Sequence, residues 1–170
     1  MPERGRIYLF DAVTLSNFAL AERLDLLVSR YGRRVRVTPE VLDEVTHGVV
    51  AGYVALSAIE EALADGFLRH ARPLSSSDKR ETYRRLLRVL APGQASCIAC
   101  AEASGGVVVT DDRTARECCA QRGVKFTGTI GILKACCLDG TLSPDEADTV
   151  LRAMIDAGYY SPVRRISDLV

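Results

Sequence analysis

Short hydrophobic runs alternate along the chain with longer stretches in which apolar residues recur at helical spacing. The short runs are typical of strands buried on both faces of a parallel sheet, and they predict strands at residues 6–11, 35–37, 106–110 and 124–126. The longer stretches predict helices over residues 13–31, 51–65, 78–90, 94–104 and 112–122. Strands that alternate with helices predict an α/β fold, with a mostly parallel central sheet of about four to five strands flanked by helices.

Capping residues mark the starts of two further helices. Thr38 followed by Pro39 favours a helix start, because Thr caps the first turn and Pro fits its first position. Ser143, with Pro144 next and Glu146 three residues on, has the pattern of a capping box. Pro and Ser residues over 72–77 predict a loop, and another helix is expected beyond residues 127–131.

Carboxylates follow directly on two of the predicted strands. The first run ends in Asp11, and the run before Thr110 ends in Asp111 and Asp112. Ligands of parallel sheets bind beyond the carboxyl ends of the strands, so these side chains are expected to share one edge of the sheet. Carboxylates that lie so close raise each other's pKa unless a cation binds them. Oxygen ligands favour Mg²⁺ or Mn²⁺, which suggests a metal-dependent enzyme acting on a phosphate ester.

Length and composition indicate one domain. We expect a single domain over residues 1–170, with a core at about 6–160 and a C-terminal tail at 161–170. Apolar residues make up 48% of the chain, which argues against wholesale disorder. Lys plus Arg and Asp plus Glu number 22 each, which argues against a general nucleic-acid coat protein but leaves room for a local basic groove. Without a signal peptide or a membrane-span pattern, a cytoplasmic protein is expected.

Six cysteines occur in three close pairs, which raises the question of zinc or disulfides. The first pair, Cys97 and Cys100, lies in an Ala-rich helical pattern rather than in a turn, and adjacent cysteines chelate poorly. We therefore expect all six to be small, buried hydrophobic residues.

The order of these motifs resembles the PIN-domain ribonucleases, a fold shared by many toxins of toxin–antitoxin pairs. The family's first strand ends in Asp, which Asp11 matches. Its second acid lies a few residues into a helix after a strand and a Pro, where this chain has Glu44. A later strand leads into a Thr-x-Asp pattern, which Asp112 matches with Asp111 beside it. Residues 123–133 resemble the last strand and helix of an uncharacterised prokaryotic PIN subfamily, and the likeness covers about residues 6–160.

One position departs from the family pattern. The family's third acid begins the Ala-rich helix just after a Gly, and here that position is Gln94. An amide oxygen can ligate Mg²⁺, but it brings no negative charge and is a weaker acceptor for a metal-bound water. The substitution predicts weaker metal binding and slower turnover.

The resemblance implies a metal-dependent endoribonuclease that hydrolyses RNA phosphodiesters. It implies Asp11, Glu44 and Asp112 as catalytic residues and ligands of Mg²⁺ or Mn²⁺, with Asp111 and Gln94 as further ligands. It also implies RNA contacts from Thr127 and Thr129 at a helix start, and from Arg113 and Arg116 on the helix before it. The implied partners are RNA, a second copy of the chain in a homodimer and, as one option, a small antitoxin protein.

Other interpretations remain open at this point. Phosphatases of the haloacid-dehalogenase type also begin with a strand ending in Asp, but they need a second Asp where this chain has Val13. No Gly-x-Gly-x-x-Gly follows a strand, which disfavours a dinucleotide-binding module. A PIN fold that has lost catalysis and serves as an RNA- or protein-binding module is the main alternative, because of Gln94. The arginines at 80, 84 and 88 form a basic helical stripe that suits either RNA phosphates or plain solvation, and solvation is the favoured explanation.

Overall fold

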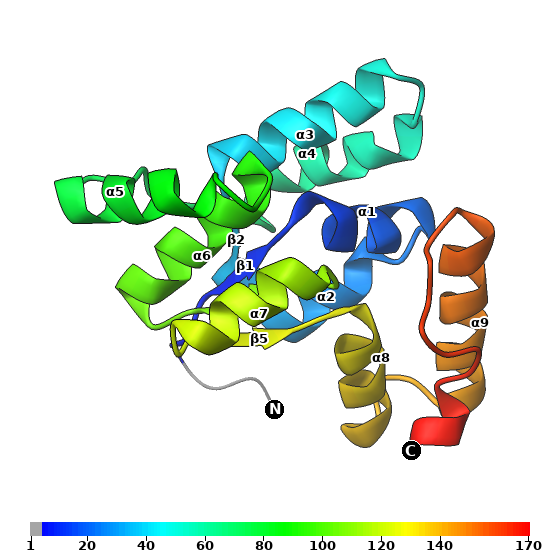
Figure 1. Cartoon of the computed structure of the whole chain (residues 1–170). Coiled ribbons are helices and arrows are strands. Elements are labelled where there is room, and N and C mark those ends of the chain that lie inside the picture. Colours follow the sequence, from blue (N-terminus) through cyan, green and yellow to red (C-terminus); the bar gives the residue numbers. More distant parts are fainter. Residues whose placement is uncertain (1–4) are drawn as a thin grey trace.

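A five-stranded parallel sheet forms the centre of the computed structural model, which describes residues 5–170 (Figure 1). The predicted domain starts at residue 1, and residues 1–4 lie outside the described residues. The strands are β1 (Tyr8–Phe10), β2 (Val35–Val37), β3 (Arg69–His70), β4 (Val107–Val109) and β5 (Lys125–Thr127). Their order across the sheet is β3-β2-β1-β4-β5, and every neighbouring pair is parallel. The α/β prediction is confirmed.

The strand order places a switch point between β1 and β4. The chain starts in the middle of the sheet, continues outward through β2 and β3, and returns to the other side of β1 for β4 and β5. The two central strands are in register from Tyr8 opposite Val107 to Phe10 opposite Val109. Asp11 N–H then donates to the Val109 carbonyl at 3.0 Å. In such sheets the crevice beyond the strand ends at the switch point is the usual ligand site.

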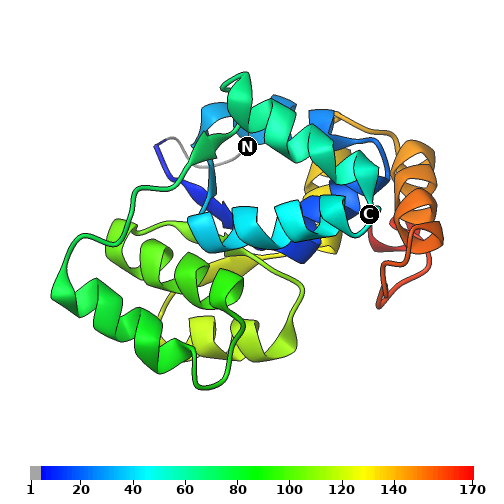
Figure 2. The same ribbon diagram turned by 90° about the horizontal axis from the view of Figure 1, so that it is seen from above.

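Helices cover both faces of the sheet. They are α1 (Ala12–Leu20), α2 (Leu24–Tyr31), α3 (Pro39–Val50), α4 (Ser57–Ala64), α5 (Ser77–Leu86), α6 (Pro92–Ser104), α7 (Arg113–Gln121), α8 (Thr129–Leu138) and α9 (Pro144–Asp156). Short 3₁₀ turns occur at η1 (Gly32–Arg34), η2 (Val54–Leu56) and η3 (Ser167–Leu169). In Figure 1, α6 and α7 lie in front of the sheet and α2 lies behind it. Seen from above, α3 and α4 form one antiparallel pair, with α5 and α6 packed together beside them (Figure 2).

Several helix boundaries differ from the predicted ones. The predicted helix over 13–31 breaks into α1 and α2 at Glu22, which adopts a positive φ of 56° without the Gly or Pro that usually marks such a break. The predicted helix over 51–65 starts later, because Gly52 turns the chain at φ 110° before η2 and α4. The helix predicted to reach Leu90 ends at Leu86 as α5. Strand β3 was not predicted, because its two residues are exposed and form no hydrophobic run.

The two predicted capping sites are confirmed. Thr38 Oγ1 accepts the Val41 N–H at 3.2 Å at the start of α3. Ser143 and Glu146 form a complete capping box at the start of α9, since each side chain accepts the other's backbone N–H.

Central strands and cysteines fill the core. All residues of β1 and β4 are buried, whereas β5 is a largely exposed edge strand. All six cysteines are free thiols; Cys97, Cys119 and Cys136 are buried and the other three are half-buried against the core. The three buried cysteines agree with the small, buried hydrophobic residues expected from the sequence, and the other three are less buried than expected.

The last ten residues fold back onto α9. Buried Asp148 accepts hydrogen bonds from the backbone N–H of Ile166 at 2.6 Å and of Ser167 at 2.9 Å, and from the Ser167 hydroxyl at 2.7 Å. Ile166 is fully buried as a result. Among residues 5–170, no helix has the length and apolar character needed to span a bilayer.

Candidate active site

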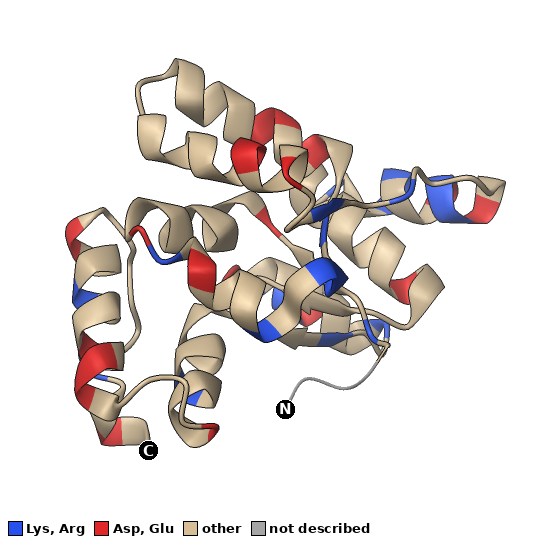
Figure 3. Cartoon of the chain, turned by 180° about the vertical axis from the view of Figure 1, so that it is seen from behind, with Lys and Arg blue, Asp and Glu red and all other residues tan. Residues whose placement is uncertain are grey.

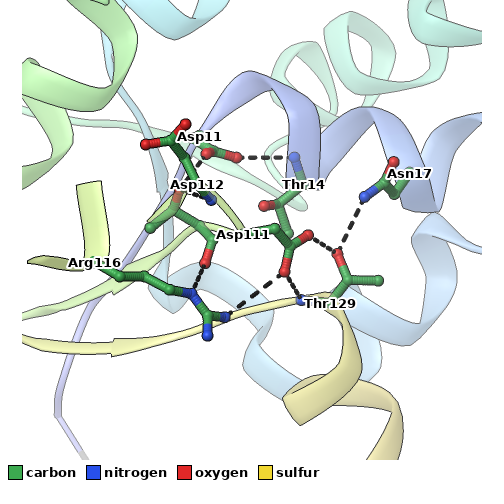
Figure 4. Close-up of polar contacts among 8 residues, drawn as sticks. Asp11, Thr14, Asn17, Asp111, Asp112, Arg116 and Thr129 are labelled. Carbon is green, nitrogen blue, oxygen red and sulfur yellow. Dashed lines mark hydrogen bonds and ion pairs between the residues drawn. The ribbon is translucent and has the colours of Figure 1, made fainter. Parts of the chain in front are cut away.

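Carboxylates from three parts of the chain gather near the switch point. Asp11 directly follows β1, and Thr110 with Asp111 and Asp112 follows β4 (Figure 4). Because these two strands are hydrogen-bonded neighbours in register, their carboxyl ends bring the two segments into contact. Thr110 forms the direct link: its hydroxyl donates to Asp11 Oδ2 at 2.6 Å and accepts the Asp112 N–H at 3.2 Å.

Asp11 is a buried carboxylate with two neutral hydrogen-bond donors. It is the N-cap of α1, where Oδ1 accepts the Thr14 N–H at 2.8 Å, and Oδ2 accepts the Thr110 hydroxyl. Only 2% of the residue is exposed. Burial raises the pKa of Asp11, the hydrogen bonds from Thr110 and Thr14 lower it in part, and the charge of Asp111 raises it again. The balance leaves a carboxyl group that a nearby cation would stabilise as the anion.

Asp111 and Asp112 have different surroundings although they are adjacent. Asp112 is exposed and caps α7, where Oδ1 accepts the Ala115 N–H at 2.8 Å. Asp111 is half-buried, and Thr129 binds both of its oxygens: the backbone N–H donates to Oδ1 at 2.9 Å and the hydroxyl to Oδ2 at 2.5 Å. Asp112 is therefore an exposed cap with one oxygen in a hydrogen bond, whereas both oxygens of Asp111 are fixed by the start of α8.

Thr129 is the centre of a buried polar network. It is fully buried, and its hydroxyl also accepts the Asn17 side-chain amide at 3.1 Å. The Tyr159 phenol also lies near Thr129 and Asp111, and burial raises its pKa to about 12. Thr127, the last residue of β5, is half-buried, and its carbonyl accepts the Thr110 N–H at 2.9 Å. Thr129 thus holds Asp111 in place, a role that the sequence motif did not suggest.

Glu44 approaches the site from helix α3. Its Oε1 accepts the backbone N–H of Gly93, at the start of α6, at 3.1 Å. A Cβ on Gly93 would collide with this carboxylate oxygen, so glycine allows the close approach. Partial desolvation raises the pKa of Glu44, the Gly93 hydrogen bond lowers it, and the charge of Asp11 raises it further. Gln94 follows Gly93 on the first turn of α6 and is half-buried.

Comparison of the sequence with models of known protein families shows which family the chain belongs to. A family model described as a PIN domain matches residues 7–170. The chain belongs to the PIN-domain family. A search of curated proteins returned no match. PIN domains are typically nucleases that use divalent metals, so the carboxylates at the switch point of this PIN domain lie where a nuclease centre is expected.

The two arginines near the site, Arg113 and Arg116, form hydrogen bonds and ion pairs with other residues of the PIN domain. Arg116 donates to the Thr110 carbonyl at 2.9 Å, approaches Asp111 at 3.7 Å, and lies over the Phe126 ring at 5.4 Å from its centroid. Arg113 pairs with Glu117 at 3.1 Å on the surface of α7, with 93% of its side chain exposed. Arg116 therefore stabilises the Thr110–Asp111 turn, and Arg113 is the more accessible of the two.

Several residues that build the site were missed by sequence reasoning. They are Thr14, Asn17 and Tyr159, and the roles of Thr110 and Gly93 were missed although both residues lie in the motifs. Asn17 had a detectable signal, because it is a polar residue on the apolar face of α1 between Leu15 and Phe18. Tyr159 and Gly93 act through contacts with residues far away in the sequence, which no local pattern reveals.

The carboxylate oxygens of Asp11, Glu44 and Asp112 suit a cation that keeps several bound waters better than one that is enclosed by protein ligands alone. Among residues 5–170, no three His, Cys, Asp or Glu side chains are grouped so that they would hold a metal by themselves. Mg²⁺ typically keeps several waters and uses only one or two carboxylates, which Asp11 and Glu44 or Asp112 can supply. In addition, the buried Thr14 hydroxyl beside Asp11 has no hydrogen-bond partner within the described chain, and a bound water would satisfy it.

Proposed function

We propose that this PIN domain is a metal-dependent endoribonuclease that hydrolyses RNA phosphodiesters. The observation that carries the proposal is Asp11, a buried carboxylate at the topological switch point whose pKa is raised by burial and by the neighbouring charge of Asp111. A buried charge with like-charged neighbours is costly unless it has a function, and perturbed carboxyl groups of this kind cluster at catalytic sites.

Mg²⁺ or Mn²⁺ would be held by Asp11, Glu44 and Asp112, directly or through water, with Asp111 and Gln94 as further candidates. When bound, such a cation supplies Lewis-acid polarisation of the scissile phosphate and lowers the pKa of a bound water. The oxygens of this donor set suit either ion.

The protein itself contributes proton transfer and orientation. Glu44 Oε1 is occupied by the Gly93 N–H, so Oε2 is the oxygen that accepts a proton from the attacking water. A raised pKa makes Glu44 a stronger base than an ordinary surface glutamate. Thr110 and Thr14 orient Asp11 through its two oxygens, and Thr129 fixes the turn that carries Asp112. Arg113 and Thr127 are proposed to contact flanking RNA.

The test is RNA cleavage by the purified full chain in the presence of Mg²⁺, Mn²⁺ or EDTA. Asp11→Asn and Glu44→Gln should abolish cleavage, and EDTA should do the same to the natural protein. Asp156→Asn is the matched control, because Asp156 is an exposed carboxylate at the end of α9 whose side chain forms no ion pair or hydrogen bond within the described residues. Cleavage that survives Asp11→Asn at the natural rate would refute the proposal.

A binding module without catalysis is the second candidate, and Gln94 is the observation that favours it. The amide leaves the site one acid short of the family pattern, so metal affinity falls. RNA binding without cleavage, at saturating Mn²⁺, would support this alternative over the nuclease.

Exposed hydrophobic residues between α3 and α4 bear on the association of the chain. We propose a homodimer, with a small antitoxin protein as an additional partner if the chain is a toxin. Val50, Tyr53 and Val54 support self-association, since they are exposed by 83%, 59% and 70% around the turn between α3 and α4. A mass in solution equal to one chain at all concentrations would contradict the dimer.

A further inference from the structure

Two neighbouring cavities follow helix α6 away from the carboxylates. The first, of about 350 Å³, is lined by the start of α3, the loop after β3, α5 and α6. The second, of about 430 Å³, lies farther along α6 and reaches Ile7 and Leu9 of the central strand region. Arg72, Pro73, Leu74 and Cys100 line both cavities. Together the cavities follow α6 from Ser96 to Ser104, which is about 12 Å of helix.

The second cavity is cationic. Arg36, Arg72 and Lys79 are in its lining, and none of the lining residues is Asp or Glu. In the first cavity, by contrast, Glu40 accompanies the arginines. Figure 3 shows the Lys and Arg positions gathered over β2, the loop after β3 and α5. The charge of the second cavity therefore favours an anion.

The cations of this cavity are held close to one another without a compensating acid. Arg36 is anchored on β2, where its guanidinium donates to the backbone carbonyls of Arg33 and Val35. Burial lowers the pKa of Arg36, and the charges of Arg69 and Arg72 lower it further. Within residues 5–170, neither Arg36, Arg72 nor Lys79 forms an ion pair with a carboxylate. An anion bound among them would relieve this repulsion.

The rest of the lining is apolar or carries hydroxyl groups. Ile7, Leu9, Leu74, Ala71 and Ala103 supply the apolar part, and Ser75 and Ser104 supply hydroxyls. An inorganic anion would use only the cationic side. A ligand with a phosphate and a flat, weakly polar ring would use both sides, and the volume lies in the range of small-molecule sites.

We propose that this cavity binds a nucleotide, with its phosphate at Arg36, Arg72 and Lys79 and its base over the apolar side chains. The nucleotide is either one residue of an RNA strand or a free mononucleotide. In the first case the inference rests on the proposed nuclease function, because the strand would continue along the first cavity toward Glu44 and Gln94. In the second case the cavity is a separate ligand site.

The experiment measures equilibrium binding to the full chain in EDTA, so that neither cleavage nor the metal site contributes. The probes are adenosine 5′-monophosphate, by calorimetry, and a short fluorescein-labelled oligoadenylate, by anisotropy. The double variant Arg72→Ala/Lys79→Ala removes two phosphate contacts. Ala103→Trp fills the cavity without changing charge, and Ala103 is exposed, so the fold should tolerate it. Arg152→Ala, an exposed arginine on α9, is the matched control; α9 lies at the far side of the molecule from α5 (Figure 1).

Both variants should weaken binding of the recognised probe by at least about tenfold, because charged hydrogen bonds and the space for the base are lost. For the oligonucleotide, the double variant should also reduce the slope of affinity against salt by about 1.4, the value for two phosphates on a single strand. Loss of mononucleotide binding identifies a free nucleotide site, and loss of oligonucleotide binding alone identifies an RNA subsite. If Ala103→Trp leaves the affinity for both probes unchanged, the cavity is not the binding site and the inference is refuted. Cleavage assays on Asp11→Asn test the nuclease separately.

Discussion

Replacement of Asp11 separates two effects of its carboxylate on stability, which are its charge and its hydrogen bonds. Each oxygen accepts one hydrogen bond, Oδ1 from the Thr14 N–H and Oδ2 from the Thr110 hydroxyl. Asp11→Asn removes the charge but keeps one acceptor oxygen, which can still cap α1. Asp11→Ala removes the charge and both acceptors. Both variants should lose RNA cleavage, so stability is the measurement that tells them apart.

The hydrogen bonds set the difference between the variants. Loss of an N-cap acceptor costs about 0.5–2 kcal/mol. The buried Thr110 hydroxyl, left without its acceptor, adds about 1–3 kcal/mol, although part of this cost also applies to the Asn variant. We therefore expect Asp11→Ala to be less stable than Asp11→Asn by about 2 kcal/mol in urea unfolding followed by circular dichroism.

The pH dependence of stability tests the effect of the Asp11 charge. Burial raises the folded pKa of Asp11 above its ordinary value of 3.8, so between the two pKa values the folded protein binds more protons than the unfolded chain. The stability that this group contributes is present below the unfolded pKa and is lost as the pH rises through the folded pKa. Removal of Asp11 also removes a charge that raises the pKa of Glu44. This second change likewise favours the stability of the variant over that of the natural protein as the pH rises.

Unfolding in EDTA at a series of pH values should therefore show Asp11→Asn gaining stability relative to the natural protein as the pH rises from about 4 toward 7. The Asp156→Asn control should show no such trend. If instead the natural protein gains on Asp11→Asn over this interval, the folded state stabilises the Asp11 anion and the argument from burial is wrong.

Three further changes test other contacts. Gln94→Glu should tighten Mg²⁺ binding by at least about tenfold, or ~1.4 kcal/mol, in calorimetry, and an unchanged affinity would show that position 94 is not a ligand position. Gly93→Ala should displace the Glu44 carboxylate and reduce RNA cleavage, and the free energy of unfolding should change by about 1 kcal/mol. Natural cleavage activity in this variant would exclude a role for the Gly93–Glu44 contact in catalysis. Desolvation opposes ionisation of Asp148, but hydrogen bonds from Ser167 and Ile166 hold its pKa at about 2, so its contribution to stability is present above pH 3.8 and is lost as the pH falls toward 2. Asp148→Asn should lower stability at neutral pH and flatten that acid limb of the stability profile.

The centre of the fold could be predicted because it depends on local patterns. The runs that form β1 and β4 are apolar throughout, and each is followed by carboxylates, so the edge of the sheet that holds Asp11 and Asp111 followed from the sequence. Strand β3 could not be predicted in this way. Arg69 and His70 are exposed, and only their pairing with β2 in the folded protein makes them a strand.

The division of roles between Asp111 and Asp112 could not be predicted either. Both follow the same strand, and either one suits a helix cap or a metal. The difference arises from Thr129, which lies 18 residues from Asp111 and binds both of its oxygens. Thr129 is in turn positioned by Asn17, at a sequence separation of 112 residues. Contacts of this range arise from the parallel topology rather than from any local motif.

Gln94 links catalysis to the stability of the cation-free protein. The negative charges of Asp11 and Asp111 already repel each other, as do those of Asp11 and Glu44. A glutamate at position 94 follows the Gly93 that binds Glu44, so it would add a third repulsion. Any two unit charges roughly 6 Å apart repel by about 3 kcal/mol at an effective dielectric of ~20, before screening by salt. Gln94→Glu should therefore unfold more easily than the natural protein in EDTA at pH 7, yet gain more stability from added Mg²⁺, because a ligand stabilises the folded state according to its affinity. The amide at this position thus favours a site that is stable without metal, and the family's acid favours one that depends on it.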